Sequence, residues 1–201
     1  MPHAYEHDRH PRRAGHVVVA TAYCAVMVAL FAVGAAPLIG IAHAPGYFGG
    51  LALWLAHPMR ATWAGIKAPY LVALGAIAVH RIDEEVSAFV PAIEELTGRQ
   101  AAAVTSPISM LIVVLTLAWI LSPLLLRTGH PLGHFGAWSL FAAFGLVEPW
   151  HFLFPLLAPE PYGYFPGMIT APIIIAAAWW GLWRMWRASR TAPQEVALGG
   201  R

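Results

Sequence analysis

The sequence predicts an all-α protein, a polytopic transmembrane helical bundle of five to six membrane segments that forms a single domain over residues 1–201. Its composition is the first reason: 59% of the residues are hydrophobic and 11% are charged, against roughly 45–50% and about 25% in soluble domains. The apolar residues also form long runs, several of them near the roughly 20 residues that a helix needs to cross a bilayer. The charged residues collect between these runs and at the chain ends.

The chain begins with a basic tail and a long apolar run. Residues 1–16 contain three arginines and are predicted to form a basic N-terminal tail. Residues 17–42 are long enough to cross a membrane as one helix, with a kink near Pro37. Residues 46–59 are apolar but shorter, so a thin span, a re-entrant helix and an interfacial helix all stay open for them.

The next two elements lead to the middle of the chain. Residues 61–80 are long enough to span, and Lys67 near their start can extend its amine to the interface. Residues 81–105 mix acidic and apolar side chains and are predicted to form an interfacial loop with a helix over 83–100. Gly98 is the expected cap at the end of that helix.

Three further spans complete the predicted bundle. Residues 106–126 and 132–157 are joined by a tight turn at 127–131 and should pack as an antiparallel hairpin. Residues 167–186 follow a loop rich in proline and glycine and form the last span. The tail, residues 190–201, is predicted to be disordered.

The positions of Lys and Arg predict a multi-pass protein of the cell membrane (inner or plasma membrane). If residues 46–59 cross, ten basic residues fall on the side of the two termini and two on the other side. With five crossings the two sides carry five and seven. Since basic residues concentrate on the cytoplasmic side, we predict six crossings with both termini cytoplasmic.

Several classes of function are excluded or disfavoured. A net charge of +2, with basic residues near chain ends, argues against nucleic acid as a partner. Cys24 is the only cysteine, so there is neither an internal disulfide nor a thiolate metal site. The sequence has no Walker loop, Gly-rich dinucleotide fingerprint or nucleophilic-serine elbow, which argues against nucleotide use and α/β-hydrolase chemistry.

The candidate site consists of two histidines and three acids. On a helix His80 shares a face with Asp83 and Glu84, and Glu148 shares a face with His151. The two spans that carry them run in the same direction, so both clusters should lie at one membrane face. Imidazole and carboxylate suit zinc, iron and manganese. We therefore predict a divalent metal, with all five residues as candidate ligands.

A structural explanation has equal weight at this point. The acids of residues 83–85 fit a solvated helix end, and a buried Glu148 needs a partner of any kind, because an unpartnered ionisable group inside a span is costly. That partner could be His80 or Lys67 in a buried structural ion pair.

Three motifs follow one another along the chain: His80-Arg81-Ile82-Asp83-Glu84, a histidine far downstream, His151, and the turn Tyr164-Phe165-Pro166-Gly167. This order resembles the family of bacterial membrane proteins named for its HXXEE motif, whose pattern is that motif, one further histidine and a YXPG turn. The likeness covers about residues 61–186. It departs at Asp83, where the family has its first Glu. The resemblance singles out these residues and implies no particular reaction.

These features favour an integral-membrane enzyme whose metal activates water or dioxygen, for hydrolysis or oxidation of a lipid-like or apolar small molecule. Glu84, Glu148 and Tyr164 are the candidate catalytic residues, and Trp150 and Phe152 are candidates for the walls of the substrate pocket. Two alternatives stay open. The same residues could act without metal in an acid–base isomerase or cyclase of an isoprenoid-like substrate, or the protein could be a non-enzymatic carrier or structural subunit. Membrane lipid is the expected partner.

Overall fold

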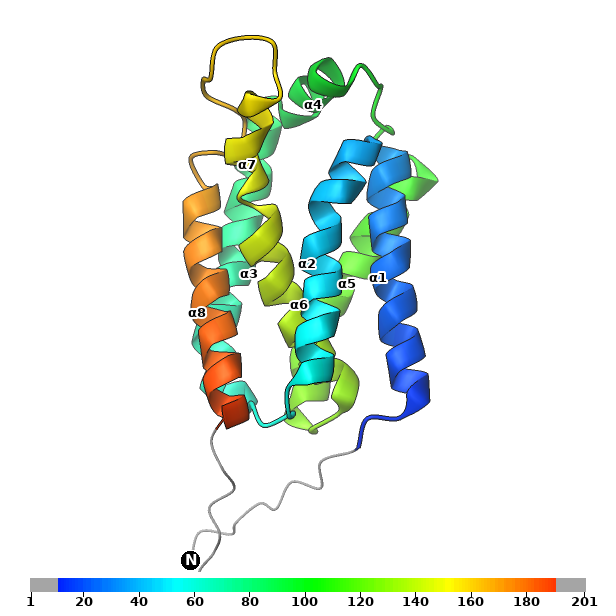
Figure 1. Ribbon diagram of the computed structural model, residues 1–201, viewed down its shortest axis with the longest axis vertical. Helices are drawn as coiled ribbons and strands as arrows, with labels where there is room; N and C mark the ends of the chain where they lie inside the picture. Colours follow the sequence, from blue (N-terminus) through cyan, green and yellow to red (C-terminus); the bar gives the residue numbers. More distant parts are fainter. Residues whose placement is uncertain (1–10, 191–201) are drawn as a thin grey trace, which may run out of the picture.

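The computed structural model describes residues 11–190, and within them the regular structure is entirely helical. The predicted all-helical bundle is thereby confirmed (Figure 1). The tails predicted for residues 1–16 and 190–201 lie mostly outside the described residues. The six long helices are α1 (Ala14–Gly34), α2 (Pro37–Ala56), α3 (Trp63–Val86), α5 (Pro107–Arg127), α6 (Pro131–Val147) and α8 (Ala171–Arg190). The short ones are α4 (Phe89–Thr97), α7 (Trp150–Leu153) and the 3-10 turn η1 (Phe154–Leu156).

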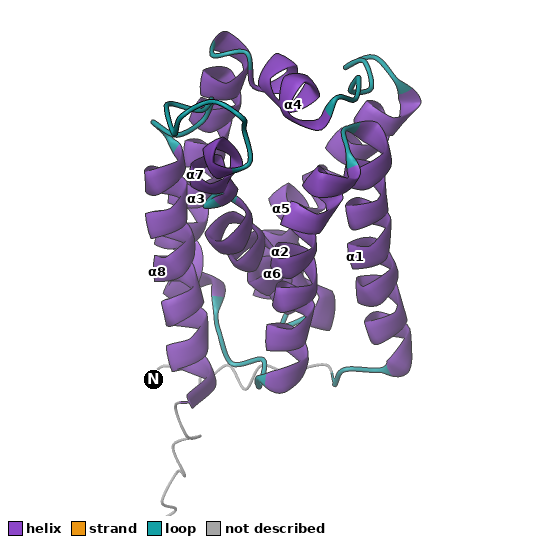
Figure 2. Ribbon diagram, turned by 45° about the horizontal axis from the view of Figure 1, so that its top comes forward, coloured by secondary structure: helices purple, strands orange, loops and turns teal. Residues whose placement is uncertain are grey.

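The long helices lie side by side, and each runs opposite to the one before it (Figure 1). We call the end where α1 begins and α8 finishes the basic end. The opposite end, where α3 and α6 finish, is called the site end. There α4 lies across the bundle and α7 continues the direction of α6 (Figure 2).

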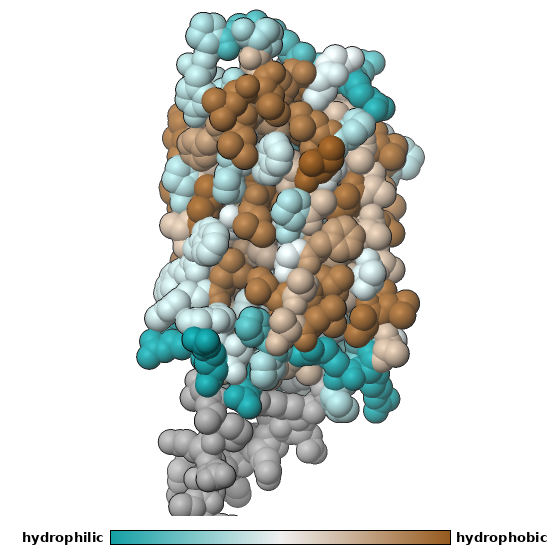
Figure 3. All heavy atoms as spheres, viewed as in Figure 1, coloured by the Kyte–Doolittle hydropathy of each residue, from teal (hydrophilic) through white to brown (hydrophobic). Residues whose placement is uncertain are grey.

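Five helical segments are long and apolar enough to cross a membrane: α1, α2, α3, α5 and the helical stretch Pro131–Leu156. The sixth long helix, α8, is not among them; it has 20 residues, three of them arginines towards its end. It packs along α3 and α6. On the face drawn in Figure 3, apolar atoms cover much of the middle of the molecule and hydrophilic atoms lie at both ends. This pattern suits a protein whose middle faces lipid.

The prediction of one helix over residues 17–42 is wrong. α1 ends at Gly34, Ala36 is extended (φ −161°, ψ 157°), and Pro37 occupies the first turn of a second helix. Proline fits that position because its missing N–H would have no acceptor there in any case. The chain reverses at this point, and the segment 46–59 is largely the second half of α2. The second helix is therefore long enough to cross a membrane.

The interfacial helix predicted over 83–100 is shorter in the structure. α3 continues to Val86, so that the acids of its last turns belong to the long helix. Ala88 has φ 62° and breaks the helix before α4 starts at Phe89. Gly98, also at positive φ (63°), caps α4 as predicted.

α6 is the central helix and is buried without interruption from Gly133 to Gly145. α2 packs closely against it because two glycines leave room for its backbone. A Cβ at Gly46 would lie 2.7 Å from Ala143 Cα, and one at Gly50 would lie 2.6 Å from Ser139 Cα. Such contacts between small residues let helix backbones approach closely in membranes. These contacts hold α6 in place, and α6 leads to Glu148 and His151.

Candidate metal centre

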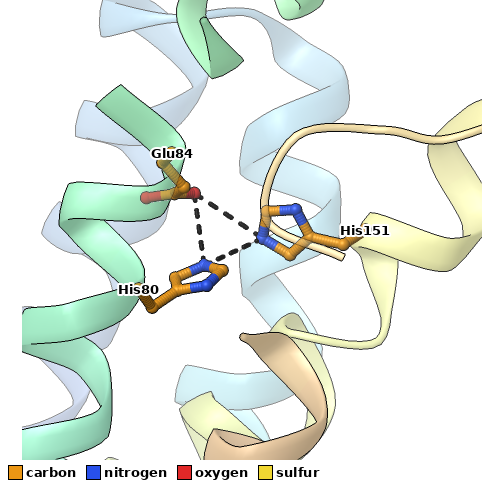
Figure 4. A group of neighbouring side chains, drawn as sticks. All are labelled: His80, Glu84 and His151. Carbon is orange, nitrogen blue, oxygen red and sulfur yellow. Dashed lines mark hydrogen bonds and ion pairs between the residues drawn. The ribbon is translucent and has the colours of Figure 1, made fainter. Parts of the chain in front are cut away.

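Four ionisable side chains meet at the site end of the bundle. His80 and Glu84 lie in the last two turns of α3, Glu148 follows the last residue of α6, and His151 belongs to α7. All are buried, with exposed fractions of 1% for His80, 6% for each glutamate and 5% for His151. Figure 4 shows how His80 and Glu84 on one helix face His151 on the other.

The ligand atoms of these side chains converge on one point. The Nε2 atoms of His80 and His151 are 3.2 Å apart. Glu84 Oε1 lies 3.4 Å from the first nitrogen and 3.6 Å from the second. Glu148 Oε2 lies 3.0 Å and 3.5 Å from the same two atoms. Among the described residues, His80, Glu84 and His151 form a group that could hold a metal ion, and Glu148 brings a second carboxylate oxygen close to both nitrogens.

The other ring nitrogen of His80 belongs to a chain of two hydrogen bonds, which we call the relay. Its Nδ1 lies 2.7 Å from Thr170 Oγ1, and the Thr170 hydroxyl donates to Asp83 Oδ2 at 2.8 Å. Because a carboxylate only accepts, the hydroxyl proton is used there. The Thr170 oxygen must then accept from His80, so His80 Nδ1 carries the proton and, in a neutral ring, Nε2 presents a lone pair.

His151 is held in the same tautomer by the backbone. Its Nδ1 lies 2.6 Å from the carbonyl oxygen of Pro166, which can only accept, so Nδ1 is the donor. In a neutral ring, its Nε2 therefore also presents a lone pair. The result is two imidazole lone pairs that face one another at 3.2 Å. Such a pair repels unless a cation or a proton lies between the two atoms.

The two glutamates differ in their surroundings. Glu84 Oε2 is paired with Arg81, which leaves Oε1 facing the histidines. Glu148 Oε2 is buried without a hydrogen-bond partner of acceptable geometry, although it lies close to both histidines. A buried oxygen without a donor is unusual in a native structure and calls for a specific partner.

The separations are close to those between ligands of one small metal ion. At metal–ligand distances of about 2.0–2.2 Å, two atoms on a tetrahedral ion lie about 3.3–3.6 Å apart. Three of the five separations between these nitrogens and oxygens, 3.4, 3.5 and 3.6 Å, lie in this range, and the other two, 3.0 and 3.2 Å, are slightly shorter. The second nitrogen of each histidine donates to a hydroxyl or a carbonyl, which is how metal-binding histidines are oriented.

The turn before α8 holds the two rings in place from one side. Pro166 supplies the acceptor for His151, and Gly167 has φ 89°. A Cβ at Gly167 would lie 2.9 Å from His80 Cε1 and still closer to the His151 ring. Glycine is therefore required at this position for two reasons: the positive φ, and the lack of space for a Cβ beside the two rings.

Aromatic side chains also lie beside His151. The Phe89 ring from α4 lies 5.2 Å from the imidazole, and that of Phe154 lies 6.3 Å from it. Phe165, in the loop before α8, packs against both phenylalanines. The centre is thus polar at its ligand atoms and apolar beside them.

The structure places the other predicted site residues elsewhere. Asp83 accepts a hydrogen bond from the Thr170 hydroxyl, which in turn contacts Nδ1 of His80. Its carboxylate therefore helps to orient His80 and does not lie beside the Nε2 atom. Tyr164 is 57% exposed, unlike the buried cluster. Trp150 packs against Phe154 in a neighbouring hydrophobic cluster. Phe152 is half-buried, and its carbonyl oxygen accepts from a tyrosine hydroxyl of the loop.

Two groups were missed by reasoning from the sequence. Thr170 is an ordinary residue at the start of an apolar run, and nothing in its spacing links it to His80. Phe89 is one of many aromatic residues. The only signal near Thr170 is the Tyr164-Phe165-Pro166-Gly167 turn just before it, which marks where the chain enters α8.

Fold and site together define an all-helical bundle with membrane-spanning character and a buried His/Glu cluster that could bind a metal. No protein-family model, curated protein or solved structure matches this chain. The site is therefore interpreted from its own geometry.

Proposed function

We propose that this protein is an integral-membrane enzyme with one divalent metal ion bound by His80, Glu84, Glu148 and His151. The observation that carries the proposal is the pair of Nε2 atoms, 3.2 Å apart, with two carboxylate oxygens within 3.6 Å of both. A metal ion held by His80, Glu84 and His151 would also give a partner to the nearby buried Glu148 oxygen, which lacks a donor. Zinc, iron and manganese all accept this set of ligands.

The metal would polarise a water molecule or a substrate oxygen, or activate dioxygen if it is iron. Glu84 and Glu148 are the groups that could exchange a proton with the reacting molecule, while Thr170 and Pro166 keep the histidines oriented. The apolar side chains of Phe89 and Phe165 near the centre, together with the apolar spans, favour a lipid-like or apolar small-molecule substrate. Hydrolysis and oxidation are the two reaction classes that fit.

We place the protein in the cell membrane with the basic end in the cytoplasm. The basic residues at that end are Arg12, Arg13, Arg60, Lys67, Arg127, Arg184, Arg187 and Arg190. All described Asp and Glu residues lie towards the site end. By the positive-inside tendency, the centre then faces the outer side and both termini are cytoplasmic. The resemblance to the HXXEE-motif family is consistent with this proposal.

The deciding experiment is the metal content of the full chain, purified in detergent through a tag without histidine and analysed by elemental mass spectrometry. We expect about one zinc, iron or manganese ion per chain. The variants His80→Ala and His151→Ala should lose it, whereas His57→Ala, at the basic end, should keep it. Folded protein that stays metal-free after anaerobic reconstitution with each of the three metals would overturn the proposal.

A second candidate function is acid–base catalysis without metal. The separation of 3.0 Å between His80 Nε2 and Glu148 Oε2 suits an imidazolium–carboxylate pair, in which a proton takes the place of the metal. Such a pair could move protons in an isomerase or cyclase of an isoprenoid-like substrate. The double variant Glu148→Gln/His151→Ala separates function from structure: if the chain no longer folds, the pair is structural, as in a carrier or a subunit without catalysis.

A further inference from the structure

His43 is a histidine of α2 that has no part in the metal centre described above. α2 is long and apolar enough to cross a membrane, and the His43 ring in it is half-buried. Its Nδ1 lies 2.8 Å from Ile39 O on the same helix. A carbonyl oxygen only accepts, so Nδ1 carries the proton and, in a neutral ring, Nε2 presents a lone pair. Within residues 11–190, no group forms a hydrogen bond with this Nε2.

His43 lies close to the level of the metal centre along the bundle. A Cβ at Gly46 would lie 2.8 Å from Val147 Cγ2, which shows where α2 and α6 meet. His43 precedes Gly46 by three residues, about one helical turn nearer the site end, and Glu148 directly follows Val147. In agreement with this position, the charges of Glu84 and Glu148 act electrostatically on His43. The imidazole is therefore near both carboxylates of the centre.

Aromatic side chains connect His43 with the surroundings of His151. The Phe31 ring of α1 stacks on the His43 imidazole, with ring centres 3.7 Å apart and planes 19° apart. Phe31 also packs against the hydrophobic cluster that contains Phe154 and Phe165. Phe154 is one of the rings beside His151. Apolar contacts thus run from His43 to the edge of the metal centre.

Packing alone explains the stacked ring but not its nitrogen. A phenylalanine would stack on Phe31 as well, without bringing a polar atom into a span, where ionisable residues mark functional sites. The Nε2 lone pair accepts a hydrogen bond from an O–H or N–H group. The nearby carboxylates disfavour an anion, and an ammonium group would compete with the metal for them. A neutral hydroxyl is the donor that fits.

We propose that His43 Nε2 accepts a hydrogen bond from a hydroxyl group of the substrate, which is therefore a lipid-like alcohol. This inference rests on the proposed function, because it names the substrate class of the same centre. Phe31 and the neighbouring aromatic cluster contact the apolar part of the molecule. The hydroxyl sets the position of that molecule relative to the metal ligands.

The test is photocrosslinking of the full chain, in a detergent without hydroxyl groups, with a dodecanol that carries a diazirine. Unlabelled dodecanol and dodecyl methyl ether compete with this probe; the ether has the same chain but no donor. We expect dodecanol to compete at a concentration about threefold to tenfold lower than the ether, the effect of one hydrogen bond. Dodecylamine, a cationic donor, is the third competitor.

Three variants of His43 separate the role of Nε2 from that of the ring. His43→Phe keeps the stack on Phe31 and should lose the preference for dodecanol over the ether. The amide nitrogen of an asparagine stands near the Nδ1 position of histidine and that of a glutamine near Nε2. His43→Gln should therefore retain the preference and His43→Asn should lose it.

The matched control is His57→Phe. His57 is also a half-buried histidine stacked on an aromatic ring, that of Trp138 at 5.4 Å, but it lies at the basic end. This variant should compete as the unchanged chain does. Circular dichroism and gel filtration check that every variant is folded, and the asparagine and glutamine variants decide the question if His43→Phe does not fold.

Equal competition by the alcohol and the ether, or an unchanged preference in His43→Phe, would overturn the proposal. Tighter binding of dodecylamine than of dodecanol would overturn the assignment to a hydroxyl. The metal content of the same samples separates this result from a failure of the proposed function. A metal-free chain that prefers dodecanol through His43 supports the alcohol site and overturns the metal enzyme, whereas a metal-loaded chain without the preference overturns only the role of His43.

Discussion

Gly167 gives the sharpest prediction, because an added methyl group there meets the metal centre directly. In Gly167→Ala, a residue with a Cβ must adopt φ 89°, which costs about 1–2 kcal/mol. The Cβ would also lie 2.9 Å from His80 Cε1. Since ordinary contacts begin near 3.4 Å, the His80 ring or the backbone must move by about 0.5 Å, and the His151 ring, which lies closer to the Cβ, must move by more. Overpacking of this kind costs about 1–3 kcal/mol.

The total expected loss of unfolding free energy is therefore about 2–5 kcal/mol. The movement also strains the bond from His151 Nδ1 to Pro166 O, so metal affinity should fall at least tenfold, as when a supporting group of a ligand is removed. Unfolding is measured by far-UV circular dichroism in a denaturant titration in detergent. Metal affinity is measured by competition with a chelator.

Gly98→Ala is the matched control. Gly98 also has positive φ (63°), but nothing lies within 4 Å of its Cβ position. This variant should lose only the unfolding free energy that a positive φ costs a residue with a Cβ, about 1–2 kcal/mol, and it should keep its metal affinity. If Gly167→Ala unfolds with the same free energy as Gly98→Ala, the turn does not pack on the two imidazoles, and the reasoning is refuted.

Two further predictions concern the support of the site and the packing of the bundle. Thr170→Val keeps the shape but removes the hydroxyl that holds His80, so metal affinity should fall about 10–100-fold while Thr170→Ser retains it; an unchanged affinity in the valine variant would contradict the relay. Gly50→Ala forces a methyl group against the Ser139 backbone and should lower the free energy of unfolding by about 1–3 kcal/mol. The control is Gly75→Ala, which has open space around its Cβ position and should not lower the free energy of unfolding. Equal stability of the two variants would refute close packing of α2 on α6.

The helices could be predicted from hydropathy, but the boundary between α1 and α2 could not. The apolar residues continue through Pro37 without a break, and a proline in such a run is compatible with a kink as well as with a new helix. Which of the two forms depends on whether α2 finds a partner. That partner is α6, and the room for it comes from glycines whose role is visible only in the packed bundle.

The core of the site was predictable because its spacing is local. His80 and Glu84 are one helical turn apart, and the directions of two spans placed His151 at the same end. The choice between neighbouring acids was not predictable. Asp83 and Glu84 point about 100° apart on the helix, and the sequence does not tell which one faces the second histidine. In the structure Glu84 faces it, and Asp83 binds Thr170 instead.

The relay through Thr170 also bears on the order in which the protein matures. His80 and Thr170 are 90 residues apart, and the acceptor for His151 comes from Pro166, in the loop before the last helix. A nascent chain that ends before this loop contains both histidines but neither of the groups that orient them. If the centre binds a metal, capture at full affinity is thus a late event in biosynthesis, and an occupied centre would mark a chain whose last helix has joined the bundle.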